Sequence, residues 1–392
     1  MTIPSGEVFD GRLALVVSNL EYGGAQRQVV ALANQLNASG GDVVVVSLSR
    51  HVPLAHALDG GAAKLRVIEK HHRFDLTVPW RLAGLLRSLE AEVTHAFLFD
   101  AEIAARLAGA LYPRTAVIGS ERNTDYLPPR RHKVPLRLTR RWCAAVIANS
   151  NAGKRFQQRV LGVPAESVYV VHNGVDLRSF APRAAELARA ETGLPPAVPI
   201  VGMFASFKTQ KNHPMFFRMA RRVLERHPQT VFLCVGEALH RGLQGSDAYQ
   251  AQMQALISEL RLEQNIRLVG NRDELLAWYS SCDVTVLTSM REGTPNVLLE
   301  SMACGVPVVA TDVADNALVV PQGQVGFVVP ADDDVAMAER VVELVASAPR
   351  RRELGRAARS WVEREFSLAR LAEKTAAVYR EVLGRRRARG RG

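Results

Sequence analysis

Short runs of β-branched and aliphatic residues alternate with amphipathic stretches along almost the whole chain. In the first half these apolar runs are LALVVSNL, DVVVVSL, LRVI, EVTHAFLF, TAVIGS, AAVIANS and VYVVHNG. The second half repeats the scheme with VPIVGMFA, TVFLCVGE, NIRLVG, VTVLTS, PVVATD and GFVVP. Between the runs, apolar residues recur at spacings of three and four, as in residues 25–36, and predict helices. Strands that alternate with helices predict an α/β protein with parallel sheets.

A polar, proline-containing stretch separates the two series of strands. It runs DLRSFAPRAAELARAETGLPPAVP and predicts a linker with a short helix, so the domain boundary is expected near residues 177–196. A chain of 392 residues also exceeds what one hydrophobic core usually organises. We therefore predict two Rossmann-like, doubly wound domains, residues 1–180 and 181–366, whose ligand sites face a shared cleft. Residues 386–392 are predicted to be a disordered basic tail.

Composition narrows the class of protein. Hydrophobic residues make up 47% of the chain and charged residues 23%, as in an ordinary soluble globular protein. No run of about 18 uncharged apolar residues is present, so no membrane-spanning helix is predicted. Before its first apolar run the chain has no basic segment and carries Glu7 and Asp10, which argues against a secretory signal. The four cysteines form no CxxC pair and are expected to be reduced thiols in a cytoplasmic protein.

The formal net charge of +11 changes this picture in one respect. It indicates anionic partners such as nucleotides, phospholipid head groups or nucleic acid. A general bias toward arginine would give the same charge, so charge alone selects none of these partners.

Two loops that follow predicted strands carry residues suited to phosphate. In SNLEYGGAQRQVV the pair Gly23-Gly24 opens a helix, where a backbone without side chains lets a ligand approach the helix N-terminus. In VGMFASFKTQKNHPMFF, Lys208 and Lys211 lie in a loop before a helix that begins near Asn212, and could neutralise a diphosphate. The alternatives are a tight turn in the first case and two solvated lysines in the second.

The stretch SMREGTPNVLLESMACGVPVVATD carries the strongest signal. The strand VTVLTS delivers Glu292 to the edge of the sheet, Gly293 and Pro295 make a turn, and a helix is predicted from about Asn296. A phosphate docked at the start of this helix would be stabilised by its dipole, and Glu300 could accept hydrogen bonds from the hydroxyls of a ribose. The alternative interpretation makes Glu300 an acid of the helix N-terminus and Glu292 a surface residue.

These segments resemble the family-4 glycosyltransferases, retaining enzymes of the GT-B fold. REGTPNVLLESMACGVPVVATD resembles the E-x7-E segment of that family, and EYGGAQRQVVALANQL is similar to its Gly-Gly-Ala-Glu turn and helix. AAVIANSNAGKRF, VVHNGVDLRSF and VGMFASFKTQKNH look like three further landmarks of the family, in the usual order. FSLARLAEKTAAVYREVL is similar to the closing helix, here residues 367–385, that crosses back to the first domain.

The resemblance implies roles for individual residues. Lys211 would contact the diphosphate of a sugar nucleotide, Glu300 would hold the ribose diol, and Glu292 would bind hydroxyls of the transferred sugar. Gly24 would approach the phosphate from the first domain, and Arg272 would border the base. The remaining donor-binding residues implied in this way are Ser206, Lys208, Thr294, Asn296, Val297 and Leu298.

The chain departs from the family pattern at two places. Ser206 stands where most members have an arginine that partners the lysine, so either Lys208 supplies the second positive charge or the diphosphate is held less firmly. Many members have a histidine on the first domain where this chain has Arg122 and Asn123. We assign Arg122 to the catalytic set together with Lys211 and Glu292, and expect His95 on the preceding strand to be a packed strand residue.

The implied reaction is a retaining sugar transfer from a UDP- or GDP-sugar. No Asp-x-Asp metal clamp is evident, since ADDDVAMAER follows the last strand and is typical of an acidic helix start. We therefore expect a metal-independent reaction without a cofactor, in which positioned cations and helix dipoles stabilise the leaving group.

The acceptor is less defined by the sequence. DYLPPRRHKVPLRLTRRWC combines apolar residues with a basic set that suits an anionic membrane surface or a lipid-linked acceptor, or is simply a solvated helix. This acceptor-side set is Arg130, Arg131, Arg137, Arg140 and Arg141. We expect a lipid-linked or glycan acceptor and a cytoplasmic protein, with peripheral attachment to the inner face of the cytoplasmic membrane as a hypothesis.

Three other functions compete with glycosyl transfer. A sugar-nucleotide epimerase of the same fold would also bind the donor, and a non-catalytic binding protein with a degenerate donor site would explain Ser206. A nucleic-acid-binding protein would explain the charge, but the chain has no recognition-helix motif, zinc module or basic strand interleaved with aromatic residues.

Overall fold

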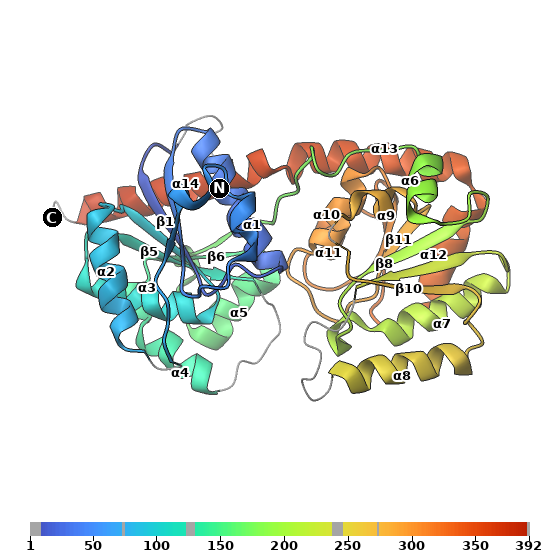
Figure 1. The fold of residues 1–392 in the computed structure, drawn as a ribbon, viewed down its shortest axis with the longest axis horizontal. Coiled ribbons are helices and arrows are strands. Elements are labelled where there is room, and N and C mark those ends of the chain that lie inside the picture. Colours follow the sequence, from blue (N-terminus) through green and yellow to red (C-terminus); the bar gives the residue numbers. More distant parts are fainter. Residues whose placement is uncertain (1–8, 73–74, 123–129, 237–245, 273, 390–392) are drawn as a thin grey trace. The chain divides into compact units, whose positions relative to one another are not determined.

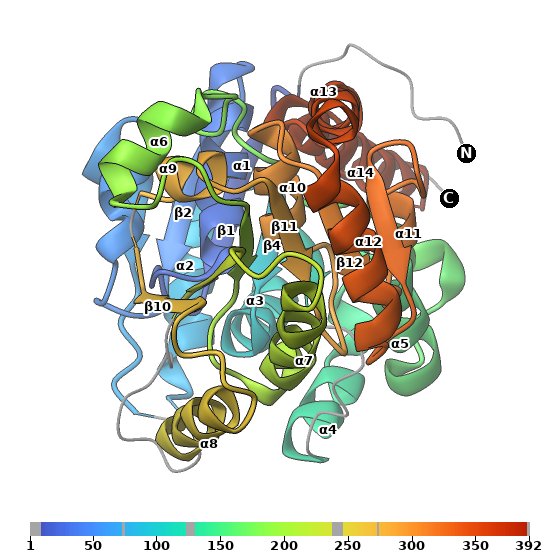
Figure 2. The ribbon, with the colours of Figure 1, turned by 90° about the vertical axis from the view of Figure 1, so that its right-hand side faces the viewer.

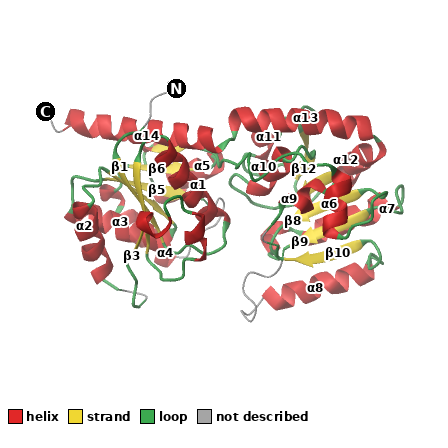
Figure 3. Ribbon diagram, turned by 45° about the horizontal axis from the view of Figure 1, so that its top comes forward, coloured by secondary structure: helices red, strands yellow, loops and turns green. Residues whose placement is uncertain are grey.

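The computed structural model describes residues 9–72, 75–122, 130–236, 246–272 and 274–389. Contacts divide the chain into two compact units, residues 1–174 with 368–392 (unit 1) and residues 175–367 (unit 2). The division at residue 174 precedes the boundary at 180 that the linker predicted. Each unit is a parallel sheet covered by helices, which Figure 3 shows in yellow and red.

The strands described in unit 1 form one parallel sheet of seven, in the order β3-β2-β1-β4-β5-β6-β7 (Figure 1). The strands are β1 (Arg12–Val17), β2 (Asp42–Ser47), β3 (Leu65–Val67), β4 (Val93–Phe97), β5 (Ala116–Glu121), β6 (Ala145–Ala148) and β7 (Val168–Val170). The α-helices are α1 (Gly24–Ala38), α2 (Thr77–Ser88), α3 (Phe99–Leu111), α4 (Arg130–Leu138), α5 (Asn151–Leu161) and α14 (Leu368–Arg389).

The strands described in unit 2 form a parallel sheet of six, in the order β10-β9-β8-β11-β12-β13. The strands are β8 (Ile200–Phe204), β9 (Val231–Val235), β10 (Ile266–Gly270), β11 (Val284–Leu287), β12 (Val308–Thr311) and β13 (Gly326–Val329). The α-helices are α6 (Ala185–Thr192), α7 (His213–Leu224), α8 (Ser246–Glu259), α9 (Leu276–Ser280), α10 (Asn296–Ala303), α11 (Asn316–Val319), α12 (Asp334–Ala346) and α13 (Ala348–Glu365).

Both sheets have the doubly wound topology that the sequence predicted. Every apolar run named above corresponds to an observed strand, and central strands such as β8 and β11 are buried along their whole length. In each sheet the direction of winding reverses beside the first strand, so the switch points lie between β1 and β4 and between β8 and β11. Ligands of such sheets bind outside the carboxyl ends of the strands at the switch point.

Helices cover both faces of these sheets. In unit 2, α7 and α12 lie side by side (Figure 2), and their apolar residues, such as Phe216 and Val341, share one buried core. The acidic segment before α12 caps that helix as predicted, because the Asp333 side chain accepts a hydrogen bond from the Ala336 N–H. Within the described residues, no helix combines the length and apolarity needed to cross a membrane.

The closing helix α14 packs against α1 of unit 1, as the resemblance implied. Leu371 and Tyr379 of α14 share a buried core with Leu32 of α1. The prediction that residues 386–392 are disordered is wrong for the part that the structure describes, since α14 continues through Arg389. The extension is held because Arg386 donates to the Pro113 carbonyl of the same unit. Residues 390–392 lie outside the described residues.

Candidate donor site and relatives of the chain

Lys211 and Glu292 meet at the switch point of the unit 2 sheet. Lys211 ends a 3₁₀ turn that follows β8, and Glu292 follows β11, the strand that pairs with β8. The Lys211 Nζ lies 2.5 Å from Glu292 Oε1, although the two residues are 81 positions apart in sequence. The topology therefore brings together the cation and the first carboxylate that the motifs singled out.

Hydroxyl groups at the ends of neighbouring strands hold this pair in place. Ser289 Oγ donates to Glu292 Oε1 at 2.7 Å, and Thr311 Oγ1 donates to the Ser289 carbonyl at 2.6 Å. Thr288 Oγ1 donates to the Lys211 carbonyl at 2.7 Å. Sequence reasoning missed these three residues. The Thr-Ser pair at the end of VTVLTS could have pointed to Thr288 and Ser289, and the threonine of PVVATD to Thr311.

The pair is sheltered but still reachable from water. The Lys211 side chain is 19% exposed and the Glu292 side chain 9% exposed. Lys208, which precedes the same turn, is exposed, and its pKa is lowered by partial loss of water and by the charge of Lys211. Two ammonium groups that repel each other across one loop are favourable neighbours for a dianion.

The backbone of Asn212 fixes the turn that carries Lys211. Asn212 adopts φ 50°, a left-handed conformation that asparagine tolerates better than most residues. Its side chain accepts a hydrogen bond from the Met215 N–H of α7 and donates to Asp332 at 3.0 Å. Arg218 holds the same Asp332 at 2.8 Å, so the lysine loop is anchored to the loop before α12.

Glu300 lies one turn into α10 and is buried, with 8% of its surface exposed. Tyr279 Oη donates to Glu300 Oε2 at 2.8 Å. Burial, reinforced by the Glu300 charge, raises the pKa of Tyr279 well above its usual range, so the phenol remains a donor. Tyr279 is itself fixed by stacking on Phe204, with ring centroids 3.8 Å apart. The alternative that Glu292 is a surface residue, and Glu300 an acid of the first helical turn, is wrong.

The start of α10 is arranged as the sequence predicted. The helix begins at Asn296 after Pro295, and the first residues of a helix direct their N–H groups outward. Leu298 already donates its N–H to the Pro295 carbonyl at 3.3 Å, so Asn296 and Val297 are better placed than Leu298 to bind a phosphate. Thr294 in the preceding turn is buried.

The other donor-side candidates in unit 2 lie on neighbouring loops. Ser206 lies two residues after the end of β8. The Ala205–Ser206 peptide packs close to Gly236, where an added Cβ would lie 2.3 Å from the Ala205 carbonyl oxygen and 3.2 Å from the Ser206 nitrogen. Arg272 follows β10, is exposed, and stacks over the Trp278 ring at 5.5 Å. A planar cation on an aromatic ring is one way to border a nucleotide base.

The candidates in unit 1 lie at the carboxyl edge of its own sheet. Gly24 opens α1 after β1, and Arg122 follows β5. Arg122 Nη1 donates to Asn173 at 2.8 Å, and its guanidinium lies over the Phe97 ring at 5.2 Å. Burial lowers the pKa of Arg122 to about 10, so the side chain keeps its charge at neutral pH. Asn123 lies outside the described residues.

His95 is a packed strand residue, as predicted. It is fully buried on β4, its Nδ1 lies 2.7 Å from Tyr379 Oη, and its Nε2 lies 2.7 Å from Ser120 Oγ. Burial and the Arg122 charge hold its pKa well below the usual range. Both ring nitrogens are therefore used within the fold.

The basic acceptor-side set divides into two kinds of residue. Arg137 and Arg140 donate to the carbonyls of Val160 and Gly162, so they satisfy the C-terminal end of α5. Arg131 and Arg141 are exposed on α4 and on the turn that follows it. Val134 and Leu138 are exposed on the same helix, 51% and 71% respectively. Arg130 begins α4, and its side chain lies outside the described residues.

Among the residues that the structure describes, no three His, Cys, Asp or Glu side chains are arranged to hold a metal ion.

Comparison with known proteins places the chain in a family. The sequence model described as Glycosyl transferases group 1 matches residues 185–361, and that described as Glycosyltransferase Family 4 matches residues 22–179. The lipopolysaccharide core biosynthesis mannosyltransferase LpcC of Rhizobium leguminosarum bv. viciae is 31% identical over 256 residues, covering 65% of this chain and 69% of that protein. The chain belongs to glycosyltransferase family 4.

A second relative and two solved structures extend the comparison. The D-inositol 3-phosphate glycosyltransferase of Corynebacterium jeikeium (strain K411) is 29% identical over 242 residues, covering 59% of this chain, and the match spans only 56% of that relative's length. The structure of Anabaena Alr3699/HepE in complex with UDP is 19% identical, with a TM-score of 0.81 over 94% of this chain and 100% of HepE. Its complex with UDP-glucose gives 20% identity and a TM-score of 0.78 over 95% and 99%. The fold is GT-B.

Proposed function

We propose that this chain is a retaining, metal-independent glycosyltransferase that moves a sugar from a UDP- or GDP-sugar to a lipid-linked or glycan acceptor. The observation that carries the proposal is the Lys211–Glu292 pair at the switch point of the unit 2 sheet. Family membership supports the reaction class, and the HepE complexes with UDP and UDP-glucose support a nucleotide-sugar donor.

The leaving diphosphate is assigned to the lysine loop and the start of α10. Lys211 and Lys208 supply positive charge from one side, and the N–H groups of Asn296 and Val297 supply partial positive charge from another. The lowered pKa of Lys208 supports this assignment, because an anion between the two ammonium groups would relieve their repulsion. These four groups would take the part that a bound metal plays in other transferases.

The nucleoside is assigned to Glu300. A buried carboxylate held by Tyr279 is fixed in one orientation, and two neighbouring hydroxyls of a ribose are suitable donors to it. The Tyr279 hydroxyl binds Oε2 and so fixes the plane of the carboxylate that we assign to the diol.

The transferred sugar is assigned to Glu292. Lys211 and Ser289 both donate to Oε1, which leaves Oε2 for hydroxyls of the sugar. A carboxylate engaged in an ion pair and a hydrogen bond is a weak nucleophile, and this supports a retaining transfer without a covalent enzyme intermediate. Glu292 then orients the sugar while the bond to the diphosphate breaks.

Peripheral attachment to the inner face of the cytoplasmic membrane is part of the proposal. Exposed Val134 and Leu138 lie on the same helix as exposed Arg131, a combination that suits an anionic lipid surface. Flotation with vesicles containing anionic lipid tests this part. Failure to float at low salt would remove the membrane hypothesis and leave the donor site untouched.

The donor site is tested by thermal stabilisation with a panel of UDP- and GDP-sugars. A ligand at a hundred times its dissociation constant stabilises the folded state by about 2.7 kcal/mol, which is readily seen as a shift in Tm. We expect one or more of these sugars to raise Tm in the parent, and a smaller shift in Glu300→Gln. Absence of any shift would contradict the proposal, and conversion of the donor to an epimer without acceptor would favour the epimerase.

A further inference from the structure

Two cavities open at the carboxyl edge of the sheet in the described part of unit 1, and two side chains line both of them. The first has a volume of about 310 Å³, and the second about 560 Å³. Phe99 of α3 and His132 of α4 line both, with ring centroids 4.2 Å apart. Both volumes fall within the range of about 300–1,000 Å³ that is usual for small-molecule sites.

Charged side chains line the smaller cavity beside apolar ones. Glu121 and Arg122 line it at the end of β5. Arg122 Nε is buried and has no hydrogen-bond acceptor among the residues that the structure describes. A buried donor without an acceptor is costly, so the chain does not fully satisfy the Arg122 guanidinium, and an anion in this cavity is a favourable partner for its charge.

The backbone is strained at the wall of the same cavity. Leu98 follows β4 and lines the cavity with φ 72° and ψ 157°, a region that residues other than glycine rarely occupy. The apolar run EVTHAFLF predicted a strand that continues past Leu98. The conformation of Leu98 ends the strand earlier, since β4 ends at Phe97 and α3 begins at Phe99. Strained backbone conformations of this kind are concentrated at ligand sites, where the placement of a side chain outweighs the energetic cost to the backbone.

The larger cavity is lined mostly by apolar side chains of α2, α3 and α4. These include Val78, Pro79, Ile103, Ala104, Leu107 and Pro135. Its two carboxylates are already paired, Asp75 with Arg81 at 3.0 Å and Asp100 with Lys70 at 2.9 Å. Arg131 also lines this cavity and is exposed. The cavity therefore combines an apolar lining with one positive charge that these carboxylates do not neutralise.

We propose that unit 1 binds a single amphiphile, with its hydrocarbon chain in the larger cavity and a phosphate-bearing head at Arg122 and Arg131. This inference rests on the proposed function and deepens it, because it names the acceptor as a lipid phosphate and not a free glycan. The charge of Arg122 stabilises the phosphate, Glu121 accepts from a hydroxyl of the head, and the side chains around Ala104 enclose the chain.

Titration calorimetry of the full chain with three soluble probes tests the chemistry of the site. Dodecyl phosphate is used below its critical micelle concentration, butyl phosphate has the same head, and dodecyltrimethylammonium has the same chain. Dodecyl phosphate is expected to bind at least about a hundredfold more tightly than butyl phosphate, since each buried methylene contributes a factor of about four. Equal binding of the two phosphates, or of the two dodecyl probes, would overturn the inference.

Variants on one helix test the location. Ala104→Phe fills the larger cavity, and Ile103→Glu places a charge in it at a half-buried position that is less demanding for folding. Each is expected to weaken dodecyl phosphate binding by at least about tenfold, by excluding part of the chain. Ala110→Phe, also on α3 but lining neither cavity, is the matched control and should bind as the parent does. Unchanged binding in folded Ile103→Glu would overturn the inference.

The same samples separate this inference from the proposed function. The thermal shift with nucleotide sugar reports unit 2 and is expected to be unchanged in Ile103→Glu. Equal binding of the dodecyl and butyl probes by the parent, with a normal nucleotide-sugar shift, would overturn only the lipid site. No shift with any nucleotide sugar would contradict the donor site, whatever the probes do.

Discussion

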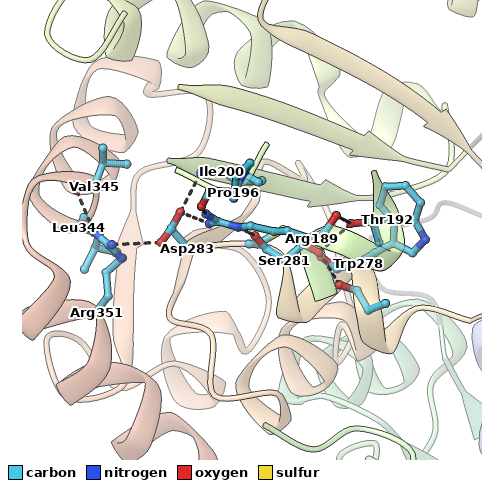
Figure 4. Close-up of polar contacts among 12 residues, drawn as sticks. Arg189, Thr192, Pro196, Ile200, Trp278, Ser281, Asp283, Leu344, Val345 and Arg351 are labelled. Carbon is cyan, nitrogen blue, oxygen red and sulfur yellow. Dashed lines mark hydrogen bonds and ion pairs between the residues drawn. The ribbon is translucent and has the colours of Figure 1, made fainter. Parts of the chain in front are cut away.

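Opposite edges of the unit 2 sheet each carry a sheltered ion pair, and the two pairs are built differently. At the amino edge, Asp283 precedes β11 and accepts from Arg189 at 2.7 Å, Arg351 at 3.1 Å and the Ile200 N–H at 2.9 Å (Figure 4). At the carboxyl edge, Lys211 and Glu292 face each other at the switch point. Both pairs join residues far apart in sequence, so the difference between them lies in how completely they are satisfied.

The amino-edge network is closed. Arg189 also donates to the carbonyls of Ser281 and Pro196, and Arg351 donates to those of Leu344 and Val345. Figure 4 shows these bonds tying α6, the end of α12 and the start of α13 to the residues at the start of β8 and β11. Charges whose donors and acceptors are mostly used by the chain itself have little left to offer a ligand.

The carboxyl-edge pair is open by comparison. An ammonium group has three N–H donors, and the second lysine beside it carries a like charge with a lowered pKa. Donors that the chain does not use and neighbouring like charges are features of a site that binds an anion. The closed network of Asp283, Arg189 and Arg351 instead fixes helices to strands, and we call it the clamp. The comparison assigns stability to the amino edge and ligand binding to the carboxyl edge.

The largest effect is expected at the clamp. Asp283→Ala leaves two sheltered guanidinium groups without their carboxylate, and breaking such a pair typically costs about 3–5 kcal/mol. We expect the free energy of unfolding in urea to fall by this order, while the folded fraction still binds the donor. Asp42→Ala is the matched control, because Asp42 also begins a strand but its pair with Lys64 is solvent-exposed. If the free energy of unfolding falls in Asp283→Ala by no more than in Asp42→Ala, the network around Asp283 does not stabilise the fold.

The second effect concerns turnover. Lys211→Ala removes one donor to the developing charge of the leaving group, which typically raises the barrier by about 2.7–4 kcal/mol, or roughly a hundred- to a thousand-fold in kcat. Stability should fall less than in Asp283→Ala, because Ser289 still donates to Glu292 and only one charged partner is removed from it. The measurements are kcat for sugar transfer and the urea midpoint of the same sample, with Lys64→Ala as control. A variant that turns over like the parent would remove Lys211 from the catalytic set.

Much of this comparison could be predicted from the sequence at the level of elements. VPIVGMFA and VTVLTS predicted β8 and β11 because these strands are buried on both faces and are apolar throughout. The start of α10 was predicted from the Gly-Thr-Pro turn, since proline suits the position just before or at the start of a helix. Local chemistry is enough for such features.

Contacts between elements could not be predicted in the same way. The donation from Tyr279 to Glu300 depends on how the short helix α9 packs against α10, and no motif marks Tyr279. Asp283 is a single acid before an apolar run, and only the fold brings Arg189 and Arg351 to it from 94 residues upstream and from α13. Arg137 and Arg140 were grouped with the acceptor side because charge is visible in a sequence, whereas their carbonyl partners on α5 are not.

The third effect tests whether Tyr279 belongs to the site or to the packing. Tyr279→Phe keeps the stacking on Phe204 and removes one hydrogen bond to a charged group, worth about 1.5–3 kcal/mol. If Tyr279 orients Glu300 for the ribose, KM for the donor should rise roughly tenfold with kcat nearly unchanged. This is expected when a mutation removes an interaction that the enzyme makes equally with the bound substrate and with the transition state. A fall in the urea midpoint with an unchanged KM would mean that Tyr279 stabilises the fold and does not take part in donor binding.

The smallest effect is expected at Lys208. Its side chain is exposed, and exposed charge interactions are worth about 0.2–1 kcal/mol, so Lys208→Ala should weaken donor binding only about two- to fivefold. The loss should shrink as salt is raised, because screening already weakens this interaction in the parent. Calorimetric titration of the donor at low and high salt measures both. A loss as large as that of Lys211→Ala, and insensitive to salt, would mean that bound donor draws Lys208 out of water. Lys208 would then supply the charge of the arginine that Ser206 replaces, and both lysines of the carboxyl edge would contribute equally to donor binding.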